Sequence, residues 1–102
     1  MAKKIPEKVI QAVLDRSGGV CEICGSNDRC QMHHVVFRSQ TTNNDVENIR
    51  YICYKDHLGT YGVHGKHGKT LNLQLKRETQ QMYFDKGLSE QEVRRKMGGK
   101  LY

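Results

Sequence analysis

The cysteine pair in "CEICG", Cys21 and Cys24, constrains the fold of this chain more than any other feature. Two thiolates three residues apart lie on one tight turn and can bind the same metal ion. A redox-active dithiol has the same spacing, but it belongs to a βαβ unit that the flanking sequence does not predict. Because a chain of 102 residues builds only a modest core, a bound metal is a common source of further stability. We therefore predict a structural zinc site built on this turn.

A tetrahedral zinc site needs two more ligands, and Cys53 in "CYKDH" is the natural third. A second C-x-x-C usually completes such a site, but here Asp56 stands in its last position. A carboxylate oxygen also binds zinc, although thiolate is more common in structural sites. Cys30, six residues after Cys24, competes for the fourth place if the intervening turn folds back. The sequence favours Asp56, and it leaves open both Cys30 and a site that holds metal weakly.

The net charge and the hydropathy of the chain indicate which partners and which cellular location to expect. The formal net charge of +6 suits a polyanionic partner, although charge alone is a weak indicator. No apolar run approaches the roughly 20 residues that span a bilayer, and the N-terminus lacks the apolar core of a signal peptide. We expect a cytoplasmic protein without a membrane partner, whose cysteines stay reduced and free to bind metal.

Apolar spacing predicts helices at both ends of the chain. The N-terminal helix is expected over residues 6–16, where Pro6 suits the first turn and the "SGG" that follows suits a left-handed cap. The C-terminal helices are expected over about 71–97, and the second of them opens with the capping box "SEQE" at 89–92. The flanks of the chain are therefore helical.

Between these helices the pattern changes to strands and loops. "VVF" at 35–37 and "IRYI" at 49–52 are strand-forming, and the polar stretch over 38–45 reads as a loop. Residues 54–62 have helical potential until glycines weaken it, and a loop rich in glycine and lysine follows. No linker divides the chain, so we expect one α+β domain over residues 1–102 with its core over about 20–70.

Two neighbouring histidines, His33 and His34, precede the apolar run. Adjacent side chains of a strand point to opposite faces, so a regular strand would place only one imidazole in a given site. Both could serve one site if the strand bends or ends there. We therefore predict a bulge or a strand end at these positions.

The order of His34, Asn48 and His57, in "MHHVVFRSQ", "DVENIRYIC" and "CYKDH", resembles that of the HNH endonucleases. Asn48 and His57 stand nine residues apart, as in family members with a zinc knuckle, and Cys53 has its expected place. Asp56 departs from the pattern, since a second cysteine usually stands there. The end of the chain looks like a branch of small HNH proteins from phages and prophages.

The resemblance implies a ββα-metal fold (the His-Me finger) with a zinc knuckle, and it implies roles for the matching residues. His34 would be the general base, Asn48 would fix the loop and the imidazole, and His33 and His57 would bind one divalent ion. Such a site hydrolyses phosphodiester bonds of double-stranded DNA. We expect Mg²⁺ or Mn²⁺ in a cell, although histidines also suit Zn²⁺, Ni²⁺ or Co²⁺.

A third protein ligand is harder to assign, because Tyr61 stands where some relatives carry a histidine. His64 lies seven residues after His57, about 10.5 Å along an ideal helix, which is too far for a shared ion in an unbroken helix. The intervening glycines would let the helix stop and the loop return. We predict His64 as the ligand, and we expect His67 to face solvent or a phosphate.

Four basic residues flank the expected site and would contact DNA phosphates or simply form a solvated face: Arg38, Arg50, Lys66 and Lys69. Phosphate contacts do not read sequence, so weakly specific cutting or nicking by a monomer or weak homodimer is expected. The phage resemblance adds a role in DNA packaging with a terminase. The alternatives are a zinc-binding module that binds DNA without catalysis and a degenerate HNH accessory protein.

Overall fold

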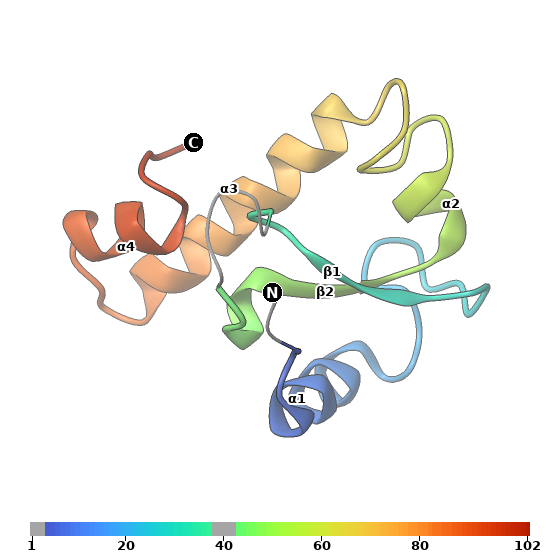
Figure 1. Ribbon diagram of the computed structural model, residues 1–102, viewed down its shortest axis with the longest axis horizontal. Helices are drawn as coiled ribbons and strands as arrows, with labels where there is room; N and C mark the ends of the chain where they lie inside the picture. The colour runs from blue at the N-terminus through green and yellow to red at the C-terminus, as the bar shows by residue number, and fades with distance from the viewer. Residues whose placement is uncertain (1–3, 38–42) are drawn as a thin grey trace.

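The computed structural model describes residues 4–37 and 43–102, which fold as a two-stranded sheet surrounded by helices (Figure 1). In chain order the elements are helix α1 (Glu7–Ser17), strand β1 (Gln31–His34), the short 3-10 helix η1 (Val46–Asn48), strand β2 (Ile49–Ile52), helix α2 (Tyr54–Leu58), helix α3 (Lys69–Asp85) and helix α4 (Glu90–Lys96). The predicted α+β class is confirmed.

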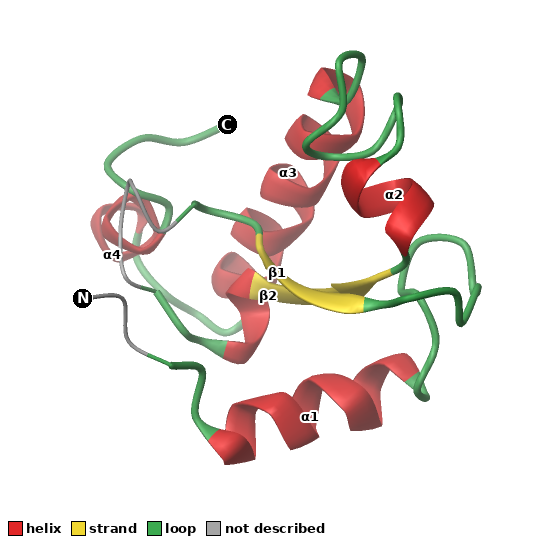
Figure 2. Ribbon diagram, turned by 45° about the vertical axis from the view of Figure 1, so that its right-hand side comes forward, coloured by secondary structure: helices red, strands yellow, loops and turns green. Residues whose placement is uncertain are grey.

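The two strands pair antiparallel, with His33 opposite Arg50 and His34 opposite Ile49. Because side chains alternate along a strand, His33 and Arg50 share one face of the ribbon, while His34 and Ile49 share the other. Helix α1 lies along the second face, and α2 and α3 lie beyond the first (Figure 2). The register therefore separates the two neighbouring imidazoles.

Three apolar clusters hold these layers together. Val9 and Val13 of α1 pack with Ile49 on one face of the ribbon. The second cluster joins the cysteine turn, both strand ends and α3, through Cys21, Val35, Ile52, Cys53, Val63 and Leu75. The third joins α3 to α4 through Val36, Tyr83, Val93 and Met97. Among residues 4–37 and 43–102 no single core joins all the layers, so the elements around the site are held by small, separate clusters.

Local signals placed the terminal helices well. α1 ends at Gly18 in the left-handed conformation, and the Ser89 hydroxyl accepts a hydrogen bond from the Glu92 backbone N–H while the Glu92 carboxylate accepts one from the Ser89 N–H. The predicted cap and capping box are confirmed. α3 begins two residues before the predicted start at 71, at Lys69.

The predicted strand run was wrong in one respect, because β1 ends at His34 and does not include Val35 and Val36. The partner chain before Ile49 turns into η1, so it offers no ladder to the next residues. Instead Asn48 bonds to them: its backbone C=O accepts from the Val35 N–H (2.8 Å) and its side chain accepts from the Val36 N–H (2.8 Å). The predicted strand end at the histidines is confirmed, and the register of residues 31–34 contains no bulge.

Within the described ranges 4–37 and 43–102, no helix has both the length and the apolar character needed to cross a bilayer.

Candidate active site

Three histidines from three segments converge beside the end of β1. His33, His57 and His64 each offer a ring nitrogen, and these atoms all lie within 4.8 Å of one another. The ring centroids are 5.3 Å apart for His33 and His57, 5.1 Å for His33 and His64, and 4.8 Å for His57 and His64. Three imidazole nitrogens at such separations can share one metal ion.

The segment after α2 explains how His64 reaches His57. α2 ends at Leu58, and the chain then forms successive tight turns in which the N–H of Gly62 bonds to the C=O of Gly59 and the N–H of Gly65 to that of Gly62. The His64 N–H donates to the His57 carbonyl (3.0 Å), which fixes the two ligands side by side. The predicted interruption of the helix and return of the loop are seen in the structure.

This path requires glycine at Gly65 and Gly68. A Cβ added at Gly65 would overlap the Gly59 carbonyl oxygen, and one at Gly68 would overlap the Gly62 carbonyl oxygen. Because both obstacles are backbone atoms, no side-chain movement relieves them. The chain can therefore bring His64 to its observed position only if glycines occupy these turn positions.

The protonation of the cluster suits metal binding. Burial, helped by the neighbouring His57 and His64, lowers the pKa of His33 to about 3. Burial also lowers the pKa of His57, with His64 contributing. Both imidazoles are therefore neutral at physiological pH, which is the form that binds metals.

His33 also shows a feature that a metal would explain. Its Nε2 is buried and has no hydrogen-bond partner among the residues that the structure describes. A buried nitrogen without a partner is costly, and such atoms are rare in folded proteins. The donor set and this atom together fit a divalent cation.

His34 lies on the other face of the ribbon but lines the same cavity, a hollow of about 230 Å³ whose walls are formed by Met32, His33, His34, Phe37, His57 and His64. Its Nε2 lies 2.7 Å from Asn44 Oδ1. This contact holds the imidazole at the rim of the cavity, outside the three-histidine cluster.

Asn48 is fully buried, and among the described residues its side chain bonds to backbone groups and not to the His34 ring. Its side-chain amide donates to the carbonyls of Val36 (3.3 Å) and Asn43 (2.8 Å). The predicted hydrogen bond from Asn48 to the imidazole was wrong, and Asn44 makes that contact instead. Asn48 acts through the chain, by tying the end of β1 to the segment that carries Asn44.

A second cluster joins the cysteine turn to the end of β2. Ligand atoms of Cys21, Cys24, Cys53 and Asp56 all lie within 4.8 Å of one another. The thiols of Cys21 and Cys53 lie 3.3 Å and 3.4 Å from Asp56 Oδ2, and the sulfurs of Cys24 and Cys53 are 3.6 Å apart. Three sulfurs and one carboxylate oxygen are the donor set that the sequence favoured for zinc.

The charge balance of this cluster calls for a cation. The hydrogen bond to Asp56 is the main reason that the pKa of Cys24 is raised to about 12. Burial opposes ionisation of Asp56, but hydrogen bonds from the three thiols lower the pKa of its carboxyl below the usual range. One negative charge therefore discourages the others, and only a cation would let several thiolates coexist. Cys30 lies outside this group and its thiol donates to the Ser26 carbonyl (3.3 Å).

The residues predicted to contact phosphate differ in their exposure to solvent. Arg50 is 3 % exposed, and its guanidinium donates to the Glu47 carbonyl and the Thr79 hydroxyl. The prediction that it contacts DNA was wrong, because its charge is used inside the fold. Arg38 lies outside the described residues.

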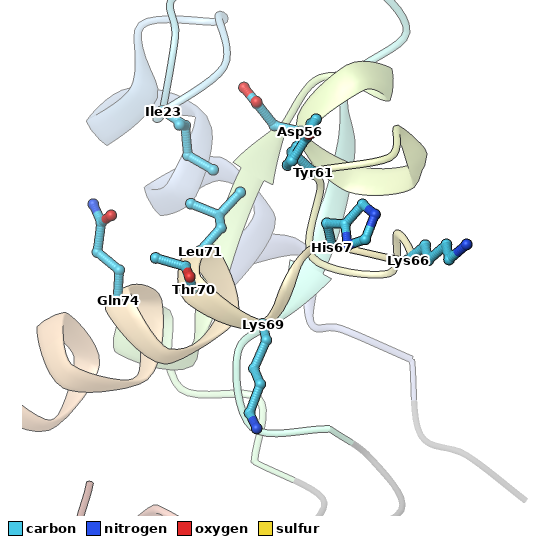
Figure 3. A pocket seen from close by; sticks show the side chains of 9 residues that line it. All are labelled: Ile23, Asp56, Tyr61, Lys66, His67, Lys69, Thr70, Leu71 and Gln74. Carbon is cyan, nitrogen blue, oxygen red and sulfur yellow. The ribbon is translucent and has the colours of Figure 1, made fainter.

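Lys66 and Lys69 are exposed and lie near one another at a different hollow, of about 800 Å³, whose other walls include His67 and Asp56 (Figure 3). In that view both amino groups extend away from the apolar floor of the hollow. His67 is exposed, as expected, and its ring lies against that of Tyr61 (5.5 Å between centroids). The Lys66 and Lys69 amino groups are free to meet an anion.

Sequence reasoning missed two residues of the site. Phe37 lines the histidine cavity, with its ring 5.9 Å from that of His33 and 5.4 Å from that of His64. Asn44 holds His34. The position of Phe37 three residues after the histidine pair was a signal for the first, whereas Asn44 sits in a polar loop where no pattern marks it.

Comparison with protein-family models gave one finding: residues 21–60 match the family described as HNH endonuclease. The match begins at the first cysteine of the turn and includes both histidines of β1, Asn48 and His57. It ends before His64, so the third imidazole of the cluster is supplied by the segment that follows. A search of curated proteins gave no match.

Proposed function

We propose, from the match of residues 21–60 to the HNH endonuclease family, that the protein is a metal-dependent nuclease that hydrolyses phosphodiester bonds of double-stranded DNA. The observation that carries the proposal is the convergence of His33, His57 and His64 beside His34. A binding module has no need for a general base next to three metal-binding imidazoles. The whole chain, residues 1–102, would act as one nuclease domain.

His34 would take a proton from the attacking water. The Asn44 side chain offers Oδ1 to its Nε2, which assigns the proton of the neutral ring to Nε2 and leaves Nδ1 as the basic nitrogen. A base held by a hydrogen bond on its far nitrogen is the usual arrangement for proton abstraction. Asn48 positions this unit through the backbone, and it touches no reacting atom.

His33, His57 and His64 would hold the catalytic ion. A divalent ion there supplies Lewis-acid stabilisation of charge on the phosphate and on the departing 3′ oxygen. Three nitrogen donors suit Mn²⁺, Ni²⁺, Co²⁺ or Zn²⁺ better than Mg²⁺. Of the two ions expected in a cell, the donor set therefore favours Mn²⁺.

The structural zinc would be held by Cys21, Cys24, Cys53 and Asp56. One three-histidine cluster on a small domain favours nicking, and weak sequence preference is expected because phosphate contacts do not read sequence. The resemblance to small phage proteins extends this proposal to DNA packaging together with a terminase.

The experiment that tests the proposal compares His34→Ala with His67→Ala on supercoiled plasmid in the presence of Mn²⁺. His67 is exposed and outside the three-histidine cluster, so its replacement is a matched control. Removing a general base typically costs 10²–10⁴-fold in rate, so we expect a loss of about that size for His34→Ala and little change for His67→Ala. Equal cleavage by the two variants would remove His34 from the mechanism, and no cleavage by the parent protein with any of the divalent ions would overturn the nuclease assignment.

A further inference from the structure

Lysines gather on the outer side of α3 around a hollow of about 220 Å³, separate from the histidine cavity. Its walls are formed by Lys69, Asn72, Leu73, Lys76, Lys100 and Tyr102. Three of these six side chains carry a positive charge and none carries a negative one. The hollow is therefore a concentrated cationic surface of the described part of the chain.

Tyr102 organises two of the lysines. The Lys76 Nζ lies 4.8 Å from the centre of its ring and the Lys100 Nζ lies 5.1 Å from it. The backbone of Tyr102 is anchored to α3, because its N–H donates to Gln80 Oε1 (2.7 Å) and Gln80 Nε2 donates to its carbonyl oxygen (3.0 Å). Both ammonium groups therefore lie against one aromatic ring, and neither forms an ion pair with a side-chain carboxylate among the described residues.

The cationic groups have spare binding capacity. None of the ion pairs between described residues involves Lys69, Lys76 or Lys100. The Tyr102 hydroxyl, in another wall of the hollow, is buried without a hydrogen-bond partner among those residues and can donate its proton to an anion. An anion that enters the hollow would also gain Coulomb attraction to these unpaired cations.

Lys76, which lines this hollow, also contacts Phe37, which lines the histidine cavity. Lys76 Nζ also lies 5.5 Å from the centre of the Phe37 ring, and Phe37 in turn packs against His33 and His64. Lys76 therefore stands one aromatic ring away from the three-histidine cluster. An extended anion that reaches the cluster would meet this lysine next.

We propose that Lys76 and Lys100, with Lys69 and Tyr102, form a second phosphate-binding site that holds the backbone of the same DNA molecule one aromatic ring away from the histidine cluster. This inference rests on the proposed function, because it takes DNA as the ligand. Of these residues only Lys69 was expected from the sequence to contact phosphate. Phosphates fit better than stacked bases, because the Tyr102 ring is already occupied by ammonium groups.

The test measures the binding of duplex DNA by fluorescence anisotropy over a series of salt concentrations, with His34→Ala in every protein so that the DNA stays intact. The variant Lys76→Gln/Lys100→Gln is compared with Lys8→Gln/Arg95→Gln, which removes the same charge from exposed positions on α1 and α4. Each lost phosphate contact lowers the slope of log K against log salt by about 0.9. We therefore expect a slope smaller by about 1.8 and roughly tenfold weaker binding for the first pair, with a clearly smaller effect for the control pair.

A third variant, Lys76→Arg/Lys100→Arg, keeps the charge and the contacts with the ring, and we expect it to restore the slope. If the protein binds DNA but the two glutamine pairs give the same slope, the second site is overturned and the nuclease proposal stands. If the protein carrying only His34→Ala binds no DNA at any salt concentration, both proposals fail.

Discussion

Burial, more than residue type, decides what each charged side chain of this protein does. Arg50 and Lys69 look alike in the sequence, as basic residues near the expected site, yet Arg50 faces α3 inside the fold and Lys69 is exposed. Burial, with a contribution from Arg16, lowers the pKa of the Arg50 guanidinium, which reflects the cost of keeping that charge inside. The sequence could not separate the two roles, because the register that turns Arg50 inward depends on pairing between distant segments.

Replacing Arg50 by methionine tests this structural role. The substitution keeps much of the apolar stem but leaves the Thr79 hydroxyl and the Glu47 carbonyl without their partner. We expect the free energy of unfolding to fall by roughly 2–4 kcal/mol, the usual cost of breaking a buried polar network, as measured by urea denaturation. The salt dependence of DNA binding should stay unchanged under conditions where the variant is folded. A stable variant with a smaller salt slope would show that Arg50 does contact phosphate.

At the scale of elements, the structure divides into parts that local sequence fixes and parts that contacts fix. α1 and α4 follow from an apolar stripe, a glycine cap and a capping box, all of which act within a few residues. The end of β1 does not follow from local sequence. It depends on Asn48, which hydrogen-bonds to the backbone of Val36 where no partner strand is present. For residues 59–68 the sequence predicted a weakened helix end and a returning loop but not the tight turns, because close approach of backbone to backbone leaves no mark beyond the glycines themselves.

The glycine turns predict a variant that damages the histidine cluster without touching a histidine. Gly65→Ala places a methyl group where the Gly59 carbonyl oxygen lies, so the turn must open and carry His64 away from His57. We expect Mn²⁺ to bind roughly tenfold or more weakly, as measured by isothermal titration calorimetry, in line with the 10–100-fold effects of residues that support metal ligands. Zinc content should remain that of the parent protein, because the cysteine cluster lies before this segment. Lys66→Ala, at the exposed neighbouring position, is the control, and equal Mn²⁺ affinity in the two variants would contradict this role for the turns.

At the scale of the whole molecule, the cysteine cluster connects the turn after α1 to the segment that joins β2 and α2. Cys21 and Cys24 follow α1, whereas Cys53 lies between β2 and α2 and Asp56 lies within α2. Cys21 and Cys53 also belong to the apolar cluster that includes Val35 and Leu75. Since His57 directly follows Asp56, the position of this proposed metal ligand depends on the same cluster. A metal here would order the active site as well as stabilise the fold.

This dependence predicts that removing zinc abolishes cleavage even when Mn²⁺ is in excess. A ligand present at about 100 times its Kd stabilises the folded state by about 2.7 kcal/mol, so zinc removal should also lower the midpoint of thermal unfolding. The assay is plasmid cleavage after chelation and dialysis, with Mn²⁺ alone or with Zn²⁺ and Mn²⁺ returned together. Full activity with Mn²⁺ alone would show that the two clusters are independent.

The contacts within the cysteine cluster distinguish the two candidates for the fourth zinc ligand, Asp56 and Cys30. Asp56 has an oxygen within reach of two thiols, while the Cys30 thiol is bonded to the Ser26 carbonyl. We therefore expect Asp56→Ala to weaken zinc binding roughly tenfold or more, and Cys30→Ser to leave it unchanged, in competition with a chromogenic chelator. Asp56→Cys should bind zinc more tightly than the parent protein, because thiolate is the commoner structural ligand. If Cys30→Ser loses zinc and Asp56→Ala keeps it, the turn between Cys24 and Cys30 must fold back in solution. Cys30 would then be the fourth zinc ligand in place of Asp56.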